Sequence, residues 1–242
     1  MRFFVSIYYW VVFTSTILVG IVVASLLWLV TLPFDRQRRA VHWLICAWGH
    51  QYLRAWPLWS TRVEGRDKLP KEPCVIIANH QSMADIIAIL GLYYPFKFVS
   101  KASLFGVPVL GWLMKMARYV SVERGRVKSM NDMMEACRTW LRAGMSVMIF
   151  PEGTYASDGH LLPFKTGAFV LAIEENVPIA PVVLEGTPQL IFEDGPWLSP
   201  TAHIRVRVME AISPQELGAD AEAAAAKVRE RYREWTQRTT SV

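Results

Sequence analysis

His80 and Asp85 are the two side chains best suited to proton transfer in this sequence, and they lie in the segment NHQSMAD, residues 79–85. A histidine can take a proton from an attacking hydroxyl group near neutral pH, and a nearby carboxylate can fix its tautomer and stabilise its positive charge. On one continuous helix the two side chains would point about 140° apart. They can meet only if His80 lies in the loop before a helix and folds back toward Asp85.

The same residues also fit an ordinary helix start. Ser82 is a good N-cap, and Asp85 stands where it would complete a capping box, which would leave His80 as a hydrogen-bonded loop residue. Asp85 could serve both purposes. The segment follows the apolar run 74–78, so it lies at the carboxyl end of a predicted strand, where α/β proteins commonly bind ligands.

A second polar loop, PEGT at 151–154, follows the apolar run 147–150. Gly153 would let a substrate approach the backbone closely, between Glu152 and Thr154. Alone, such a tetrapeptide is most often a plain turn. Its position at the end of a second predicted strand, opposite the His80 loop, makes it a candidate part of the same site.

Two cationic residues, Lys101 and Arg124, also follow predicted strands. Most lysines and arginines are solvated surface residues, and either one taken singly would be read that way. Two cations at strand ends on the same side of the sheet indicate a phosphate site.

Beyond residue 60, short apolar runs alternate with helical stretches, which predicts an α/β fold with a mixed, largely parallel sheet flanked by helices. Predicted strands cover residues 74–78, 96–100, 119–122, 147–150, 179–184 and 204–208. Predicted helices cover residues 83–92, 130–143, 165–175 and 220–238.

Residues 3–34 contain no charged side chain. As a helix, residues 7–29 alone would be about 35 Å long, enough to cross a membrane. A cleaved signal peptide is a poorer interpretation, because the run is long and lacks a small-residue cleavage pattern. Three arginines, Arg36, Arg38 and Arg39, follow the run, so the remaining chain is predicted on the cytoplasmic side.

The next segment, 40–59, mixes histidine and arginine with four tryptophans. It predicts a helix in the lipid headgroup region, with a re-entrant helical hairpin as the competing geometry. The expected organisation is therefore an N-terminal membrane helix and interfacial segment over 1–59, and a catalytic α/β domain over 60–242. Such an N-terminal part would anchor the protein to a membrane.

Composition agrees with a membrane-bound domain. The 242 residues are 52% hydrophobic but still 19% charged, and the formal net charge is +5. A positive charge suits anionic lipids or nucleic acid, and the many Trp and Phe residues around the apolar segment favour lipids. Cys46, Cys74 and Cys137 form no CxxC pair and indicate a reducing compartment.

Four blocks together resemble the glycerolipid acyltransferases typified by 1-acyl-glycerol-3-phosphate acyltransferase, also called lysophosphatidic acid acyltransferase. The NHQSMAD segment resembles the family's NHxxxxD motif, and residues 111–124 resemble its second block, which ends in arginine. FPEGT at 150–154 resembles the family's FPEGTR, and VPIAPV at 177–182 its fourth block. Four blocks in order are far more specific than any one of them.

The resemblance implies that His80 is the general base and Asp85 its partner. The fourth block would line the acyl site. The acceptor would be bound by Lys101, Arg124, Glu152, Gly153 and Thr154.

The implied reaction moves a fatty acyl chain from acyl-CoA or acyl carrier protein to the sn-2 hydroxyl of 1-acyl-glycerol-3-phosphate, giving phosphatidic acid. No cofactor or metal is expected: His80, Asp85 and Glu152 make a poor zinc signature. The expected partners are a lysophospholipid, the acyl donor and membrane lipids, with no nucleic acid. The expected location is a bacterial inner membrane, with the catalytic domain on the cytoplasmic side.

Tyr155 departs from the family pattern, because it stands where FPEGTR has its arginine. The departure leaves the acceptor headgroup open and keeps a lyso-aminolipid or another lysolipid as alternatives. A further alternative is that Lys165 reaches into the site and replaces the missing cation. A catalytically silent membrane-binding module is a further alternative, although such a module needs no base. A serine hydrolase is disfavoured because the sequence has no GxSxG elbow.

Overall fold

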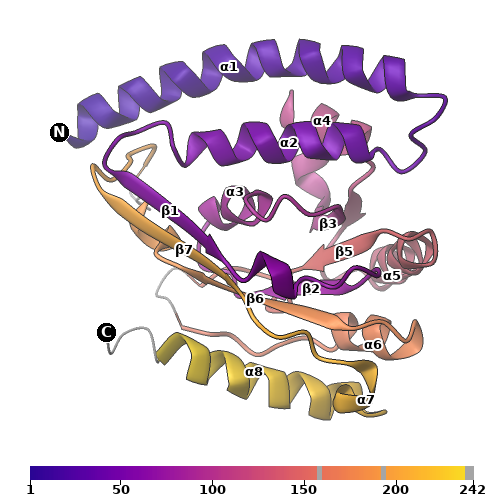
Figure 1. Cartoon of the computed structure of the whole chain (residues 1–242). Helices are drawn as coiled ribbons and strands as arrows, with labels where there is room; N and C mark the ends of the chain where they lie inside the picture. The colour runs from indigo at the N-terminus through magenta and orange to yellow at the C-terminus, as the bar shows by residue number, and fades with distance from the viewer. Residues whose placement is uncertain (157–159, 192–194, 238–242) are drawn as a thin grey trace.

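Seven strands form one sheet at the centre of the computed structural model, which describes residues 1–156, 160–191 and 195–237 (Figure 1). The strand order is β1-β7-β6-β2-β5-β3-β4. Neighbouring strands are parallel except β6 and β7, which confirms the predicted mixed, largely parallel sheet. The strands are β1 (Trp59–Glu64), β2 (Val75–Ala78), β3 (Phe96–Lys101), β4 (Val120–Val122), β5 (Ser146–Ile149), β6 (Ile179–Glu185) and β7 (Ala202–Val208).

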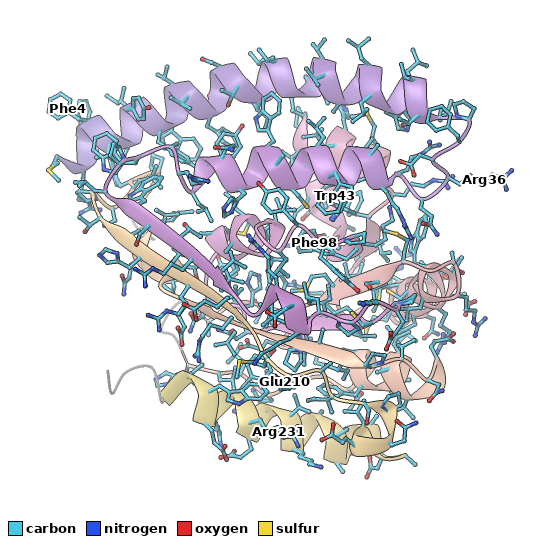
Figure 2. All side chains as sticks on the ribbon, viewed as in Figure 1. Phe4, Arg36, Trp43, Phe98, Glu210 and Arg231 are labelled. Carbon is cyan, nitrogen blue, oxygen red and sulfur yellow. The ribbon has the colours of Figure 1, made fainter. Side chains whose placement is uncertain are left out.

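Helices cover both faces of the sheet (Figure 1). Side chains fill the space between the layers; Phe98 of β3 lies in the apolar core beneath the first layer, whereas Arg36 projects into solvent (Figure 2). The first layer holds α1 (Arg2–Thr31), α2 (Arg39–Tyr52), α3 (Ala84–Leu90) and α4 (Leu110–Met116); the second holds α5 (Val127–Arg142), α6 (Gly167–Glu174), α7 (Pro214–Leu217) and α8 (Ala221–Gln237).

The central strand β2 is buried along its whole length. Ile76 and Ala78 join the apolar core under the first helix layer, and Val75 and Ile77 join the core under the second. A strand covered on both faces needs apolar side chains at every position. This is why the central strands show as unbroken apolar runs in the sequence.

The structure adds one strand that the sequence pattern did not predict. β1 pairs in parallel with β7 at the edge of the sheet. Its sequence, WSTRVE, places Arg62 and Glu64 on a strand with a single neighbour, where only every second side chain is needed for packing. Such a polar edge strand lacks the apolar run by which the other strands were recognised.

The helices differ from the predictions at several positions. α4 lies inside the second sequence block and was not predicted as a helix. α5 begins three residues earlier than predicted, and α6 begins two residues later. Residue 238, the last of the predicted C-terminal helix, lies outside the described residues.

The helices α1 and α2 lie side by side as a hairpin over the first layer (Figure 1). Along one face of α1, Val5, Tyr9 and Ala24 are buried. At Gly20, an added Cβ would lie 3.0 Å from the ring of Trp48, so the small residue lets the helices approach closely. The two helices therefore form a closely packed helical hairpin.

The opposite face of α1 is exposed and apolar. Among the described residues, α1 is the one helix that is long and apolar enough to cross a membrane, and it is mostly uncovered by protein. α2 is inward of α1 and buries His42, Cys46 and His50. The outer apolar surface therefore belongs mainly to α1, at Phe4, Ile7, Val11, Leu18, Val19, Val22, Leu26 and Leu29.

Candidate functional site

The predicted site residues converge on one edge of the sheet. β2, β5, β3 and β4 are parallel neighbours, so the loops after their carboxyl ends lie along the same edge. From β2 the chain passes through α3 to β3, which lies beyond β5 in the sheet. From β5 it passes through α6 in the opposite direction, to β6, which lies beyond β2. The loops after β2 and β5 therefore flank a topological switch point, which is where open α/β sheets bind ligands.

The side chains of His80 and Asp85 meet as the sequence predicted. His80 lies in the loop before α3, and its Nδ1 is 2.8 Å from Oδ2 of Asp85. The same oxygen accepts the backbone N–H groups of Gln81 at 2.6 Å and Ser82 at 2.8 Å. Asp85 is fully buried, so the donors on Oδ2 replace part of the water that a carboxylate would otherwise need, while Oδ1 has no hydrogen-bond partner among the described residues.

The capping interpretation of this segment is half right. Asp85 does accept the N–H of Ser82, as in a capping box. The reciprocal bond is replaced, because the Ser82 hydroxyl accepts the N–H of Ala84 at 3.2 Å. The N-cap is Met83, one residue later than predicted. Asp85 thus both orders the loop and holds the histidine.

The contact with Asp85 also decides which histidine nitrogen can act. An ionised carboxylate only accepts hydrogen bonds, so Nδ1 of His80 must carry the proton and Nε2 is left as an acceptor. The imidazole stacks on the ring of Phe150 at 4.0 Å between centroids, and the ring of Tyr155 meets it edge-on at 5.6 Å. The ring plane is therefore fixed, with Nε2 available as a base.

Glu152 holds two loops together. Its Oε1 accepts the backbone N–H of His80 at 2.7 Å, and its Oε2 accepts that of Leu162 at 2.8 Å. Burial raises the pKa of Glu152, and these two N–H donors oppose the rise. Both oxygens accept backbone N–H groups, one from the His80 loop and one from the segment before α6. The acceptor-binding role of Glu152 remains a prediction.

Gly153 leaves room for a further cation, the side chain of Lys165, beside the loop after β5. Its φ of +72° lies in the left-handed region, and an added Cβ would lie 2.6 Å from Nζ of Lys165. The backbone N–H of Lys165 donates to the carbonyl oxygen of Pro151 at 2.8 Å. Lys165 therefore packs on the loop that carries the predicted acceptor-binding residues Gly153 and Thr154.

Lys101 and Arg124 lie on neighbouring strand ends. Lys101 is the last residue of β3 and pairs in register with Val122 of β4, two residues before Arg124. Both cationic side chains are exposed. They lie along the same edge of the sheet as His80, as predicted. In the strand order, however, β3 is two positions from β2, and β4 is three.

Asn79 supports the candidate site, and the motif alone assigned no role to it. It is buried, and its side-chain amide pairs with both backbone groups of Leu184, at 2.9 Å and 2.8 Å. The amide thus continues the ladder between β2 and β6 by one residue beyond Ala78. It fixes the position from which His80 enters the loop.

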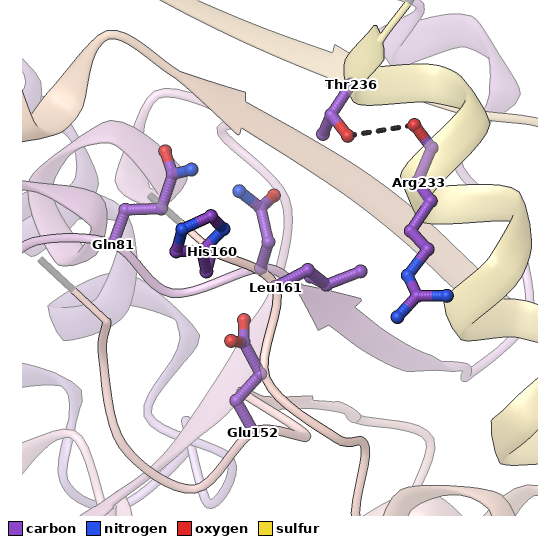
Figure 3. A pocket seen from close by; sticks show the side chains of 7 residues that line it. Gln81, Glu152, His160, Leu161, Arg233 and Thr236 are labelled. Carbon is purple, nitrogen blue, oxygen red and sulfur yellow. Dashed lines mark hydrogen bonds between the residues drawn. The ribbon is translucent and has the colours of Figure 1, made fainter. Parts of the chain in front are cut away.

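A polar cavity of about 270 Å³ lies on the α8 side of the His80 loop (Figure 3). Glu152 lies at its base, with Arg233 of α8 on the opposite wall. Among the described residues, no group of three or more His, Cys, Asp or Glu side chains is placed to hold a metal ion.

Comparison with known proteins agrees with this geometry. The family model named Acyltransferase matches residues 60–185, about half of the chain, and this range includes His80, Asp85 and the loop after β5. The chain belongs to the acyltransferase family. α8 and the α1–α2 hairpin lie outside the matched range.

Several relatives of this family member carry the same printed name, 1-acyl-sn-glycerol-3-phosphate acyltransferase. A chloroplastic protein of Brassica napus is 40% identical over 66% of this chain and 47% of its own length. One from Arabidopsis thaliana is 35% identical over 75% of this chain and 51% of its own, and one from Escherichia coli is 34% identical over 61% and 62%. The chain thus spans about half the length of the plant relatives.

The fold is also that of a solved structure. The crystal structure of the 1-acyl-sn-glycerophosphate acyltransferase from Thermotoga maritima matches with a TM-score of 0.79. The match covers 98% of this chain and 96% of that one at 23% sequence identity. It therefore extends the shared fold to the N-terminal hairpin and to α8.

Proposed function

We propose that this family member transfers a fatty acyl chain from acyl-CoA or acyl carrier protein to the sn-2 hydroxyl of 1-acyl-glycerol-3-phosphate, giving phosphatidic acid. The observation that carries the proposal is the His80–Asp85 pair at the switch point, with Nε2 available as a base. The names of the relatives supply the acceptor.

The residues support a direct transfer. Nε2 of His80 takes the proton of the acceptor hydroxyl as the oxygen attacks the thioester carbonyl. Asp85 stabilises the imidazolium that forms. The carbon–sulfur bond then breaks, the proton passes to the departing sulfur, and His80 returns to its starting state without an acyl-enzyme intermediate.

Charge around the loops favours a phosphate-bearing acceptor. Lys101 and Arg124 are exposed at adjacent strand ends, and Lys165 lies beside Gly153. We assign the acceptor phosphate to these cations, with Gly153 and Thr154 lining the approach. Lys165 takes over the task of the arginine that Tyr155 replaces.

Tyr155 gives one specific reason to keep a second acceptor class. A phenol offers one neutral hydrogen bond, whereas arginine grips a phosphate with two charged ones. Tyr155 is 46% exposed beside His80, where it could contact a bulkier or less anionic headgroup. A lysolipid other than lysophosphatidic acid, such as a lyso-aminolipid, is therefore the alternative acceptor.

For the membrane, we propose that α1 lies along the surface with its apolar outer face in the lipid. α1 contacts the domain near both ends: Trp10 donates to the carbonyl oxygen of Pro196 at 2.7 Å, the Ser6 hydroxyl accepts the N–H of Leu198 at 2.9 Å, and Thr31 is buried. A perpendicular helix would carry these polar partners into hydrocarbon. The membrane we expect is a bacterial inner membrane, with the domain on its cytoplasmic side.

A panel of lysolipid acceptors tests the function. Purified protein in lipid vesicles is given radiolabelled acyl-CoA or acyl-loaded carrier protein, and phospholipid products are separated by chromatography. The proposal predicts phosphatidic acid as the main product, lost in His80→Ala. A protein that consumes no thioester with any lysolipid would contradict it.

A further inference from the structure

The C-terminal helix α8 reaches the catalytic loops through Arg229. The guanidinium donates from Nε to the carbonyl oxygen of Leu162 at 2.9 Å, and from its terminal nitrogen to that of Leu161 at 2.8 Å. Two charged donors on consecutive carbonyls fix both the position and the direction of this segment. Residues 161 and 162 lie between β5 and α6, far from α8 in sequence.

The same segment leads directly to the catalytic base. The N–H of Leu162 donates to Glu152, whose other oxygen accepts the N–H of His80. Arg229, the 161–162 backbone, Glu152 and His80 thus form one continuous hydrogen-bonded chain. Glu152 is only 4% exposed. Leaving one oxygen of a buried carboxylate without its donor costs free energy, so the carboxylate will move to regain a partner or water.

Tyr232, one helical turn after Arg229, holds α8 against the sheet. It is fully buried, and its hydroxyl lies between β2 and β6, where it accepts the N–H of Val182 at 3.0 Å and lies 2.9 Å from the carbonyl oxygen of Ile77. Residues three positions apart on a helix share a face. The anchor therefore keeps the Arg229 guanidinium in register with the loop.

We propose that Arg229 is a positioning residue for His80, acting through the backbone of residues 161–162 and the Glu152 carboxylate. The inference rests on the proposed function for its kinetic test. It assigns a catalytic contribution to α8, which lies beyond the residues 60–185 that the family model matches. It also gives Glu152 a role that needs no contact with the acceptor.

Arg229→Met tests the proposal, since methionine keeps the helix and much of the side-chain length but has no donor. A displaced base lowers kcat by roughly 10- to 100-fold while KM for acyl-CoA and for the lysolipid changes little. The kcat of Arg229→Lys, which keeps one charged donor group, should lie between those of the wild type and Arg229→Met. The matched control is Arg231→Met, which removes another partly buried arginine of α8, one that pairs with Glu216 instead.

A double-mutant cycle separates positioning from mere packing. If Arg229 acts through Glu152, then Arg229→Met should cost little further kcat in a Glu152→Gln background. Additive losses, or a wild-type kcat in Arg229→Met, would overturn the proposal. Should Arg229→Met fail to show a normal thermal transition, the same cycle is run with Arg229→Lys, where unchanged kcat would count against it.

Hydrogen exchange keeps this proposal distinct from the proposed function. Wild-type protein that acylates no lysolipid would overturn the function, yet the amide protons of His80 and Leu162 can still be followed. The proposal predicts faster exchange at both amides in Arg229→Met and unchanged exchange in Arg231→Met. Unchanged exchange at His80 in Arg229→Met would overturn it.

Discussion

Oδ2 of Asp85 lies 2.8 Å from Nδ1 of His80 and at the same time accepts the N–H groups of the two residues that follow His80. One oxygen therefore orders the loop and sets the tautomer of the base. This double role explains why the helix-capping and catalytic interpretations both fitted the sequence.

Asp85→Asn should keep the conformation of the His80 loop but lose most of the acyl-transfer activity. The amide oxygen can take the place of Oδ2, where it still accepts the N–H groups of Gln81 and Ser82 and the Nδ1–H of His80. The neutral amide, however, cannot stabilise the positive charge that His80 gains when it takes the proton of the acceptor hydroxyl. We expect kcat to fall by roughly 10²- to 10⁴-fold, measured beside a thermal unfolding curve that stays near wild type.

Lys165→Ala should weaken recognition of the phosphate. Because Nζ lies beside Gly153, its loss should raise KM for lysophosphatidic acid about tenfold, in the range of a charged hydrogen bond. Acceptors without a phosphate monoester should change less. The matched control is Lys128→Ala, an exposed lysine on α5; an equal effect of both variants would remove Lys165 from the acceptor site.

Tyr155→Arg should restore the arginine of the FPEGTR motif, which this chain lacks. An arginine can hold a phosphate with two charged donors. The ratio of kcat/KM for lysophosphatidic acid to that for other lysolipids should rise, and most clearly in a Lys165→Ala background. An unchanged acceptor ranking in both backgrounds would show that position 155 does not tune specificity.

Lys97 should make stability depend on pH. Its ammonium group is fully buried and donates to the carbonyl oxygens of Gln37 and Ala117. Burial lowers the pKa of Lys97 to about 7, whereas the unfolded chain keeps the ordinary value of 10.5. Between these values the unfolded state binds more protons, so stability should rise with pH from about 7 toward 10.

The check on Lys97 is thermal unfolding in detergent between pH 7 and 9.5. The slope of stability against pH should become flatter in Lys97→Met and stay as in wild type in Lys128→Met, which changes an exposed lysine. A slope that is the same in all three proteins would assign the pH dependence to other groups.

The outer face of α1 should determine vesicle binding. Val19→Asp and Leu26→Asp place a carboxylate on exposed positions of that face without touching the packed face, so binding to anionic vesicles should fall while the fold is kept. Val127→Asp is the control, because Val127 is equally apolar and exposed but begins α5 on the other face of the sheet. Equal binding by all three variants would place the membrane contact elsewhere.

The sheet and the two loops of the candidate site could be predicted because they depend on local patterns. Unbroken apolar runs mark strands that are covered on both faces, and polar residues directly after them mark the carboxyl edge. The edge strand β1 was not predicted, because Arg62 and Glu64 interrupt its apolar pattern. The helix α4 was not predicted, because it is short and lies inside the second sequence block, which contains Gly111.

The supporting contacts could not be predicted, because each joins residues far apart in the chain. The Asn79 amide finds the backbone of Leu184 only once β2 and β6 are neighbours, and Arg229 finds the 161–162 carbonyls only once α8 has docked. The packing of Gly20 on Trp48, which lays α1 along the domain, is of the same kind.

The most direct measurement is the steady-state rate of acyl transfer by purified His80→Ala in vesicles that contain lysophosphatidic acid and acyl-CoA. The account predicts a kcat lower by roughly 10²- to 10⁴-fold, because only the general base is removed, with thermal unfolding and vesicle binding kept near wild type. A folded, vesicle-bound His80→Ala protein that turns over at close to the wild-type rate would contradict the account.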